Sequence, residues 1–191
     1  MGLLTLKQSD LAYRLDFALD GVAVATLGAT LLVASPRADA LTDTLLAAAG
    51  LSSWSAIEYV LHRFVLHGLQ PFRRWHDAHH RRPTELICSP TVLSASLIVV
   101  LVFLPTLWLV GPWHACALTF GVLAGYFSYA VMHHATHHWR ARSAWFRRRK
   151  RWHALHHRDA AHANCFGVTS GLWDRLLGTA PATAADELRR R

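Results

Sequence analysis

The histidines of this 191-residue chain are the residues most able to do chemistry, because they recur in spaced groups. There are fourteen, and they are dispersed rather than gathered in a terminal run as a purification tag would be. In the stretch from Trp152 to Thr179 they follow the pattern H-x-x-H-H, at His153, His156 and His157. Positions i, i+3 and i+4 of an α-helix lie on one face, so we expect these imidazoles to point the same way. Several neutral imidazoles on one face suit a transition metal better than a protein core.

Three more groups of histidines precede this one. The H-x-x-H-H pattern occurs a second time, and another group contains a pair spaced four apart, which again lies on one helical face. His62 and His67 are five apart, about 140° around an ideal helix, so they converge only if the helix ends or distorts, or if a metal lies between their faces. Gly68 and Pro71 favour an end there. The three groups are His62 with His67; His76 with His79 and His80; and His133 with His134, His137 and His138.

About ten imidazoles are too many for one ion, so the sequence indicates two metals. It has no Glu-x-x-His repeat, which excludes the carboxylate-rich di-iron site of ferritin-like bundles. Nitrogen ligands suit iron, zinc or copper, and ligand type alone does not choose between them. Surface histidines in a basic region would explain any single residue, but not four patterned groups. Cys88, Cys116 and Cys165 have no regular spacing and predict neither a disulfide framework nor a Cys-x-x-Cys zinc site.

The elements that must carry these groups are strongly hydrophobic. Hydrophobic residues make up 52% of the chain and charged residues 17%, which is low for a soluble domain. A bilayer core of about 30 Å needs about 20 residues of helix. We therefore predict an all-α integral membrane protein with a single domain, residues 1–191, and four transmembrane helices under a cytoplasmic helical cap. The helices are predicted at residues 17–34, 41–66, 91–110 and 115–132, and the cap at residues 67–88 and 133–191.

The first hydrophobic stretch has a second interpretation, as a secretory signal, because residues 38–40 (Ala-Asp-Ala) resemble a cleavage site. Asp16 and Asp20 do not suit the basic flank of a signal, and the stretch exceeds the usual apolar region of about 7–15 residues. We therefore interpret it as a transmembrane helix.

Two features inside the later stretches bear on helix packing. Pro105 lies within the third and predicts a kink. Gly121 and Gly125 lie four apart in the fourth, a spacing that allows close helix approach but fits simple helix flexibility equally well.

The charge of the chain, +8 with histidine neutral, predicts its orientation. Lys and Arg concentrate in segments 68–82 and 139–158, whereas the loops on the opposite side carry only Arg37. By the positive-inside rule, both termini and all the histidine groups are expected in the cytoplasm, with His114 on the opposite side. The densest basic run, residues 147–151, is explained by anionic headgroups at about 1 kcal/mol per residue, so no nucleic-acid partner is predicted.

Taken in order, these segments resemble the fatty acid hydroxylase superfamily, the integral-membrane histidine-box oxygenases that include sterol desaturases and fatty acid 2-hydroxylases. The resemblance covers residues 58–179, most of the chain. One histidine box is weak evidence, but four in order with the family's closing signature are highly specific. The matching segments are EYVLHRFVLH (58–67), WHDAHHRRP (75–83), YAVMHHATHH (129–138), WHALHH (152–157) and FGVTSGLWDRLLGT (166–179).

The resemblance implies a monooxygenase with a non-haem di-iron centre, which uses O2 to insert oxygen into a lipid C–H bond. It implies two iron ions as cofactors, with zinc able to replace them in purified protein. The histidines at the family's ligand positions are His62, His67, His76, His79, His80, His133, His137, His153, His156 and His157. His138 is expected as a neighbour rather than a ligand, and His134 falls where relatives often carry an aromatic residue. Candidates for fixing imidazole tautomers are Glu58, Asp77, Asn164 and Asp174.

The resemblance also limits the substrate. The third box and the closing signature differ from those of the compact bacterial carotenoid hydroxylases, so an acyl-lipid or sterol-type substrate is expected. Hydroxylation of a fatty acyl chain at position 2 is the leading prediction, and sterol or carotenoid hydroxylation or a desaturation stays open. The membrane helices would give the acyl chain a dry path, and the cap would exclude water from the metals.

The electrons for this reaction must come from elsewhere. Some 2-hydroxylase relatives carry a fused cytochrome b5-like domain, for which this chain has no room. A separate donor is therefore expected, either a cytochrome b5-like protein or a ferredoxin with its reductase.

Two non-enzymatic classes compete with this interpretation. A metal transporter or metal-storage protein would carry ionisable residues within its spans, and these are nearly absent apart from Asp20, Asp43 and Glu58. A bis-histidine haem protein for electron transfer would show a Soret band.

Overall fold

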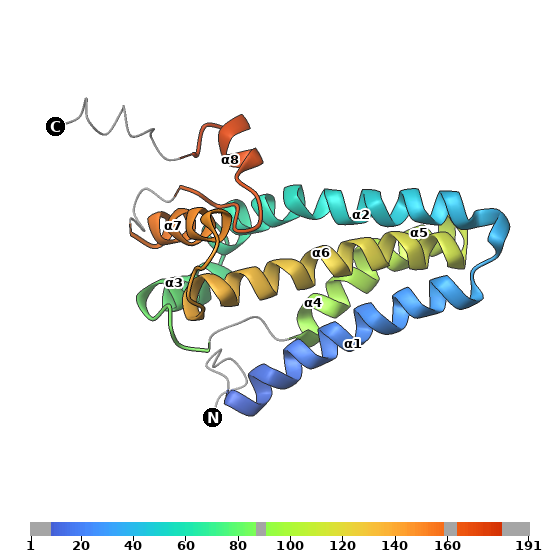
Figure 1. Ribbon diagram of the computed structural model, residues 1–191, viewed down its shortest axis with the longest axis horizontal. Helices are drawn as coiled ribbons and strands as arrows, with labels where there is room; N and C mark the ends of the chain where they lie inside the picture. Colours follow the sequence, from blue (N-terminus) through green and yellow to red (C-terminus); the bar gives the residue numbers. More distant parts are fainter. Residues whose placement is uncertain (1–8, 87–90, 159–163, 181–191) are drawn as a thin grey trace. The chain divides into compact units, whose positions relative to one another are not determined.

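The computed structural model describes residues 9–86, 91–158 and 164–180 (Figure 1). Every regular element in those three ranges is a helix, as the sequence predicts. The chain forms two compact units, which we treat separately. The apolar unit comprises Met1–Ala56 and Thr84–Val131, and the histidine unit comprises Ile57–Pro83 and Met132–Arg191. The assignment of residues 1–191 to one domain stays a prediction.

Four helices in the described part of the chain are long and apolar enough to cross a membrane, which agrees with the predicted spans. They are Asp10–Ala34, Arg37–Leu66, Thr91–Val110 and Pro112–His138. The first begins at Asp10 rather than residue 17, because the Ser9 hydroxyl caps it by accepting a hydrogen bond from the Ala12 amide at 3.2 Å. The fourth continues beyond residue 132 to His138, so its polar histidine end is part of the same helix.

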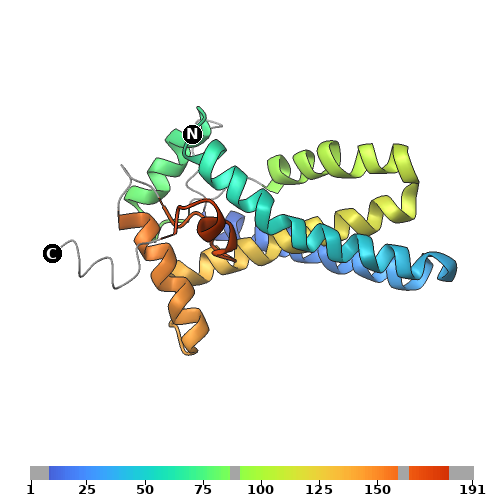
Figure 2. The ribbon, with the colours of Figure 1, turned by 90° about the horizontal axis from the view of Figure 1, so that it is seen from above.

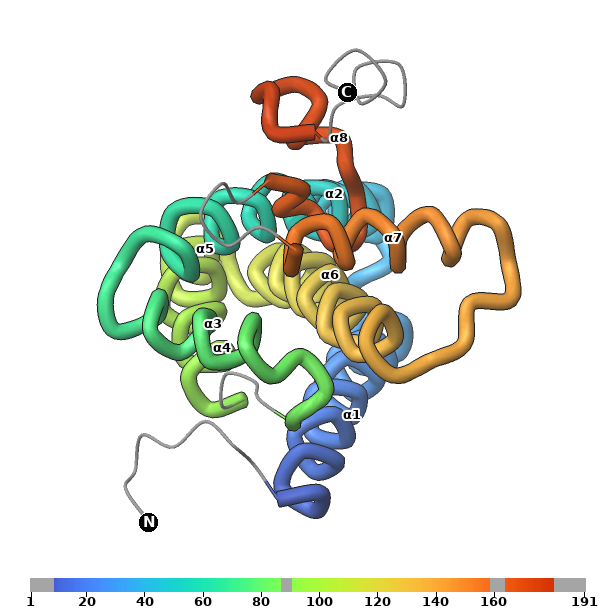
Figure 3. The backbone as a smooth tube through the Cα atoms, turned by 90° about the vertical axis from the view of Figure 1, so that its left-hand side faces the viewer, coloured from blue at the N-terminus to red at the C-terminus, as the bar shows by residue number. Residues whose placement is uncertain are grey.

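Helix α6 (Pro112–His138) is the centre of the apolar unit. Viewed end-on, it lies between α1 (Asp10–Ala34) and α2 (Ala40–Val60), as Figure 3 shows. Glycines make these contacts close. Gly121 of α6 faces the Ala47 carbonyl of α2, and Gly50 of α2 faces the Leu118 carbonyl of α6. A side chain at either position would overlap backbone atoms, so at Gly121 the structure favours close helix approach over the alternative of simple helix flexibility.

The third span is interrupted where the sequence predicts a kink. It consists of α4 (Thr91–Ile98), the π-helix η3 (Val99–Phe103) and α5 (Leu104–Val110), drawn in green in Figure 2. Pro105 lies in the first turn of α5, where its missing N–H costs least. The wider turn of η3 directly precedes it, and wide turns accommodate a proline ring that would otherwise clash with the preceding turn.

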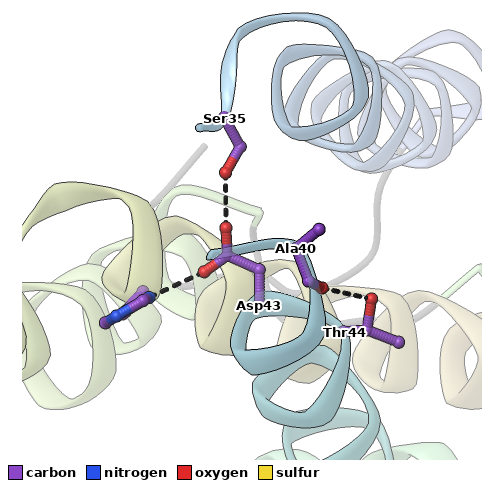
Figure 4. A network of polar contacts seen from close by, with 5 residues as sticks. Ser35, Ala40, Asp43 and Thr44 are labelled. Carbon is purple, nitrogen blue, oxygen red and sulfur yellow. Dashed lines mark hydrogen bonds and ion pairs between the residues drawn. The ribbon is translucent and has the colours of Figure 1, made fainter. Parts of the chain in front are cut away.

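A buried carboxylate fastens the loop between α1 and α2 to the start of α6 (Figure 4). Asp43 accepts a hydrogen bond from the Ser35 hydroxyl at 2.5 Å and contacts Nδ1 of His114 at 2.7 Å. This contact gives His114, which stands apart from the other histidines in the sequence, a structural role in the apolar unit.

The histidine unit is built from short helices. They are the π-helix η2 (Leu61–Leu66), α3 (Phe72–Arg81), the last turns of α6, α7 (Ala144–Arg158) and α8 (Leu172–Leu176). Residues 87–88, 159–163 and 181–191 of the predicted cap lie outside the described residues, as do Cys88 and His162. Cys116 and Cys165 are free thiols.

Replacing Gly121 with alanine is expected to destabilise the protein by about 1–3 kcal/mol. The added methyl group would meet the backbone of α2 at Ala47, which cannot rotate away as a side chain could. The better helix propensity of alanine, about 1 kcal/mol, would offset only part of this cost. Thermal unfolding of the detergent-solubilised protein measures the change. Ser128→Ala, at an exposed position of the same helix, should unfold at the wild-type temperature, and an equal midpoint for both variants would contradict the packing described here.

Candidate metal centre

The ten histidines predicted from the sequence come together in two groups of five within the described part of the histidine unit. In each group the nearest ligand nitrogens all lie within 4.8 Å of one another, and every member is buried or half-buried. The first histidine group is His62, His67, His76, His80 and His156. The second histidine group is His79, His133, His137, His153 and His157. That these residues bind metal stays a prediction at this point.

Each H-x-x-H-H motif serves both groups. His76 and His80 of α3 belong to the first group, while His79 between them belongs to the second. In α7 the division is reversed, because His156 joins the first group and its neighbours join the second. Around a helix, residue i+4 lies about 40° from residue i in one direction, and residue i+3 lies about 60° from residue i in the opposite direction. The side chains at i+3 and i+4 therefore diverge by about 100° and can reach different groups. The rings of His80 and His157 stack at 4.2 Å where the groups adjoin.

The convergence of His62 and His67 depends on the π-helix η2. The sequence predicts that residues five apart meet only if the helix distorts between them. In η2 the His67 amide donates to the His62 carbonyl at 3.2 Å, an i→i+5 hydrogen bond, and the two ring centroids are 5.3 Å apart. Single π-turns of this kind occur often at functional sites.

The facing ring nitrogens have the spacing of ligands around one ion. In the first group, Nε2 of His76 is 2.9 Å from that of His62 and 3.1 Å from that of His80. In the second, Nε2 of His153 is 2.8 Å from that of His137 and 3.1 Å from that of His157. Two nitrogens at about 2.1 Å from an ion are about 3.0 Å apart at a right angle and about 3.4 Å apart at a tetrahedral angle. The donor set therefore fits an ion with more than four positions better than a tetrahedral one.

The electrostatics of the site keep these rings neutral. Burial, reinforced by the neighbouring histidines, lowers the pKa of His79 to about 3 and that of His157 to about 2. The same causes, burial first, hold the pKa of His76, His153 and His156 well below the ordinary value. A neutral imidazole has a free lone pair, which is the form that binds a metal.

Two rings of the first group are anchored by backbone carbonyls. Nδ1 of His62 lies 2.5 Å from the Phe166 carbonyl oxygen, and Nδ1 of His156 lies 2.7 Å from that of Asn164. A carbonyl can only accept, so each Nδ1 carries the proton and each Nε2 lone pair faces the group. Asn164, a predicted tautomer-fixing residue, thus acts through its main chain.

Glu58 and Asp174, the candidates for fixing imidazole tautomers, bind instead the backbone of the closing segment, residues 164–179. Glu58 accepts hydrogen bonds from the amides of Val168 and Thr169, and Asp174 accepts them from the amides of Phe166 and Gly167. Both carboxylates therefore act on the histidines indirectly, because they bind the backbone segment whose carbonyls accept from His62 and His156.

The other two predicted neighbours lie outside the groups. Asp77 pairs with Arg73 at 4.0 Å on the exposed side of α3. His138 stacks on His134 at 4.5 Å, and neither residue joins a group.

Two features of the histidine unit are not predicted from the sequence. The Phe166 ring packs against the rings of His62, His67 and His156 at centroid distances of 5.5 to 5.8 Å, and so covers one side of the first group. Arg149 is buried and lies over Trp152 at 5.0 Å, whereas the basic run that contains it was expected to face headgroups. Its position four residues before His153 is the signal that could have placed it on the inner face.

The region of the chain that contains this site is similar to known proteins. A sequence model described as fatty acid hydroxylase matches residues 47–179, which include all ten histidines and the closing segment. The chain is 35% identical over 152 residues to a dihydroceramide fatty acyl 2-hydroxylase of Arabidopsis thaliana, covering 74% of this chain and 62% of that protein. It is 31% identical over 144 residues to the ceramide very long chain fatty acid hydroxylase scs7 of Schizosaccharomyces pombe, covering 68% of this chain and 40% of that protein. The chain thus spans less than two thirds of the length of these relatives.

A solved structure is similar as well. It is full-length scs7p, of which only the hydroxylase domain is visible, with a TM-score of 0.76 and 26% sequence identity. The similarity covers 95% of this chain and 70% of that one.

Substitution of the neighbouring residues His137 and His138 tests the assignment of histidines to the second group. His137→Ala should reduce the metal content of the purified protein from about two ions per chain to about one, because it removes a member of the second group. His138→Ala should leave the content unchanged. Inductively coupled plasma mass spectrometry of all transition metals gives the count, whichever metal is loaded. Equal losses in the two variants would contradict the assignment.

Proposed function

Because the chain belongs to the fatty acid hydroxylase family, we propose that it is an O2-dependent hydroxylase of lipid C–H bonds. The proposed substrate is a fatty acyl chain carried by a membrane lipid, attacked at position 2. The observation that supports this most strongly is the pair of five-histidine groups inside the region that the family match covers. Relatives with names that specify dihydroceramide and ceramide acyl chains suggest lipids of that type as the first to test.

Iron is the proposed metal in both groups. The ten histidines of the two groups would hold it, and their all-nitrogen donor set suits iron, copper and zinc alike. Zinc has no redox chemistry, so it does not fit the proposed oxidation. When bound, the iron would supply the activation of O2, which protein side chains cannot perform.

The chain's own residues would prepare and protect this site. The anchored rings of His62 and His156 present their lone pairs without having to reorient. The Phe166 ring covers the first group, and its apolar edge would keep water from the imidazoles on that side. Burial of the histidines keeps them in the neutral, metal-binding form.

We also propose that the histidine unit faces the cytoplasm and receives electrons from a separate protein. Its described surface is strongly basic. Helices α3 and α7 expose arginines, and among residues 57–83, 132–158 and 164–180 the half-buried Asp77 is the one acid that is not buried. The exposed arginines of the two helices include Arg73, Arg74, Arg81, Arg147, Arg148 and Arg151. Such a surface favours an acidic donor, a cytochrome b5-like protein or a ferredoxin, through electrostatic steering.

Lipid analysis tests the proposed reaction. Cells that express the chain under oxygen should accumulate acyl lipids one oxygen heavier, with fragmentation that places the hydroxyl at position 2. Cells that express His153→Ala should lack these species, because that variant loses a buried member of the second group. Untargeted lipidomics by mass spectrometry compares the two at equal protein levels. Identical lipids in both cultures would overturn the proposal.

Charge reversal tests the donor surface. Arg151→Glu, on the exposed side of α7, should raise the KM for the reduced donor several-fold and weaken its salt dependence, with little change in kcat. Arg37→Glu is the matched control, because Arg37 is also exposed but lies in the loop predicted to face away from the cytoplasm. Initial rates at several donor concentrations and ionic strengths give both quantities. A similar effect of the two reversals would refute docking on α7.

A further inference from the structure

The two histidine groups differ in how their outward-facing nitrogens are held. In the first group, Nδ1 of His62 and Nδ1 of His156 each donate to a backbone carbonyl. In the second, Nδ1 of His153, Nδ1 of His157 and both nitrogens of His79 are buried without a hydrogen-bond partner among the described residues. Nδ1 of His80 in the first group lacks such a partner as well. The difference is therefore that two rings of the first group, His62 and His156, are oriented by backbone carbonyls before any ion arrives, whereas those three rings of the second are not.

Both anchoring carbonyls belong to the closing segment, Asn164–Thr179. The ends of this segment are joined, since the Cys165 amide donates to the Thr179 carbonyl at 2.9 Å. Cys165 itself adopts a left-handed backbone with φ of 57°, uncommon outside glycine. Gly167 has no room for a side chain because the Ser170 carbonyl lies against it. The segment is thus a tight loop with one defined backbone path.

Glu58 fixes one side of this loop from its place in α2. The carboxylate is 3% exposed and accepts the Val168 amide at 2.5 Å and the Thr169 amide at 3.0 Å. The Thr169 hydroxyl also donates to it. A buried carboxylate that accepts several N–H and O–H donors forms strong, charge-assisted hydrogen bonds.

Asp174 fixes the other side from within the loop. It is fully buried and accepts the Phe166 amide at 2.8 Å, the Gly167 amide at 2.9 Å and the Thr179 hydroxyl at 2.8 Å. The Thr179 proton is therefore engaged with Asp174.

Tyr59 extends this network. Because the Thr179 hydroxyl donates to Asp174, the Tyr59 phenol must donate to Thr179 across their 3.0 Å contact. The phenol oxygen accepts from Nη1 of Arg63 at 2.6 Å. Every hydrogen bond from Arg63 to Asp174 thus has an assigned direction. The Gly167 amide, which shares a peptide unit with the Phe166 carbonyl, also donates to Asp174, so that carbonyl is held towards His62.

We infer that the closing segment presets two members of the first histidine group, His62 and His156, for metal, whereas His79, His153 and His157 of the second take their orientation from the ion. Glu58 and Asp174 are then positioning residues that act on His62 and His156 through the backbone. The first group should bind metal more tightly than the second and fill first. The inference rests on the proposed function only in taking the groups to be metal sites, and not on the reaction.

The size of the effect follows from general experience with residues that orient metal ligands. Loss of a partner that fixes a ligand's tautomer and direction usually costs about 10–100-fold in metal affinity. A difference of at least about tenfold between the two groups is expected on the same basis.

Single-site variants measure the intrinsic affinities. His79→Ala removes a member of the second group, and His62→Ala removes a member of the first. The full-length proteins, purified in detergent and stripped of metal, are titrated with Co2+, followed by its visible absorption and by native mass spectrometry. Each variant should hold one ion tightly, so repulsion between two cations does not enter the comparison. His79→Ala should bind Co2+ at least about tenfold more tightly than His62→Ala.

Asp174→Asn then tests the route. An amide offers one acceptor oxygen and places an N–H group against a backbone donor, so the Phe166 or Gly167 amide loses its partner. In the His79→Ala background this change should weaken Co2+ binding about 10–100-fold. In the His62→Ala background it should have no effect. Asp10→Asn, at an exposed acid in the first turn of α1 in the apolar unit, is the control and should change neither affinity.

The inference is overturned if the two single-site variants bind Co2+ equally, or if Asp174→Asn weakens both alike. Circular dichroism of the apo-proteins shows whether each variant folds. Should Asp174→Asn fail to fold, Tyr59→Phe and Thr169→Val decide instead. Tyr59→Phe removes the two hydrogen bonds of the phenol and Thr169→Val removes the one from the Thr169 hydroxyl, each at nearly constant volume. Both should weaken Co2+ binding in the His79→Ala background alone. Absence of hydroxylation with ordered Co2+ binding would refute the proposed function and leave this inference standing.

Discussion

The mutual repulsion of buried lone pairs is the constraint on which the histidine unit depends. Neutral imidazoles whose nitrogens face one another at 2.8 to 3.1 Å can share few protons, and buried polar groups without partners are costly. A cation at the centre of each group would convert that cost into binding. Other features of the unit serve this arrangement: the π-turn brings His62 towards His67, and the closing segment accepts hydrogen bonds from Nδ1 of His62 and Nδ1 of His156.

Sequence periodicity predicts the helices and the membership of the site well, because both are local properties. The four apolar helices agree with the predicted spans, and all ten predicted histidines come together. The partition into two groups is not local. It depends on the 100° between positions i+3 and i+4, and on which neighbouring helix each ring meets. The contact of His62 with Phe166 joins residues 104 apart, a separation at which spacing carries no information.

The roles of the two carboxylates also could not be predicted from the sequence. Glu58 and Asp174 are recognisable in the sequence as polar residues near ligands, and direct contact with a ring is the simplest role for them. The structure gives them a different one, since backbone carbonyls hold the rings and the acids hold the backbone. A carbonyl fixes a tautomer without adding charge beside the ion. The negative charges of Glu58 and Asp174 do not touch the histidine rings, and backbone amide donors stabilise them.

The sharing of each H-x-x-H-H motif between the groups has a consequence for how such a protein can diverge. In many proteins with two sites, each site occupies its own stretch of chain and can be duplicated, exchanged or deleted as a module. Here α3 and α7 each contribute to both groups, so no contiguous cut separates them. Loss of one group and retention of the other would therefore need point substitutions at scattered positions. The two centres are inherited together as one indivisible unit.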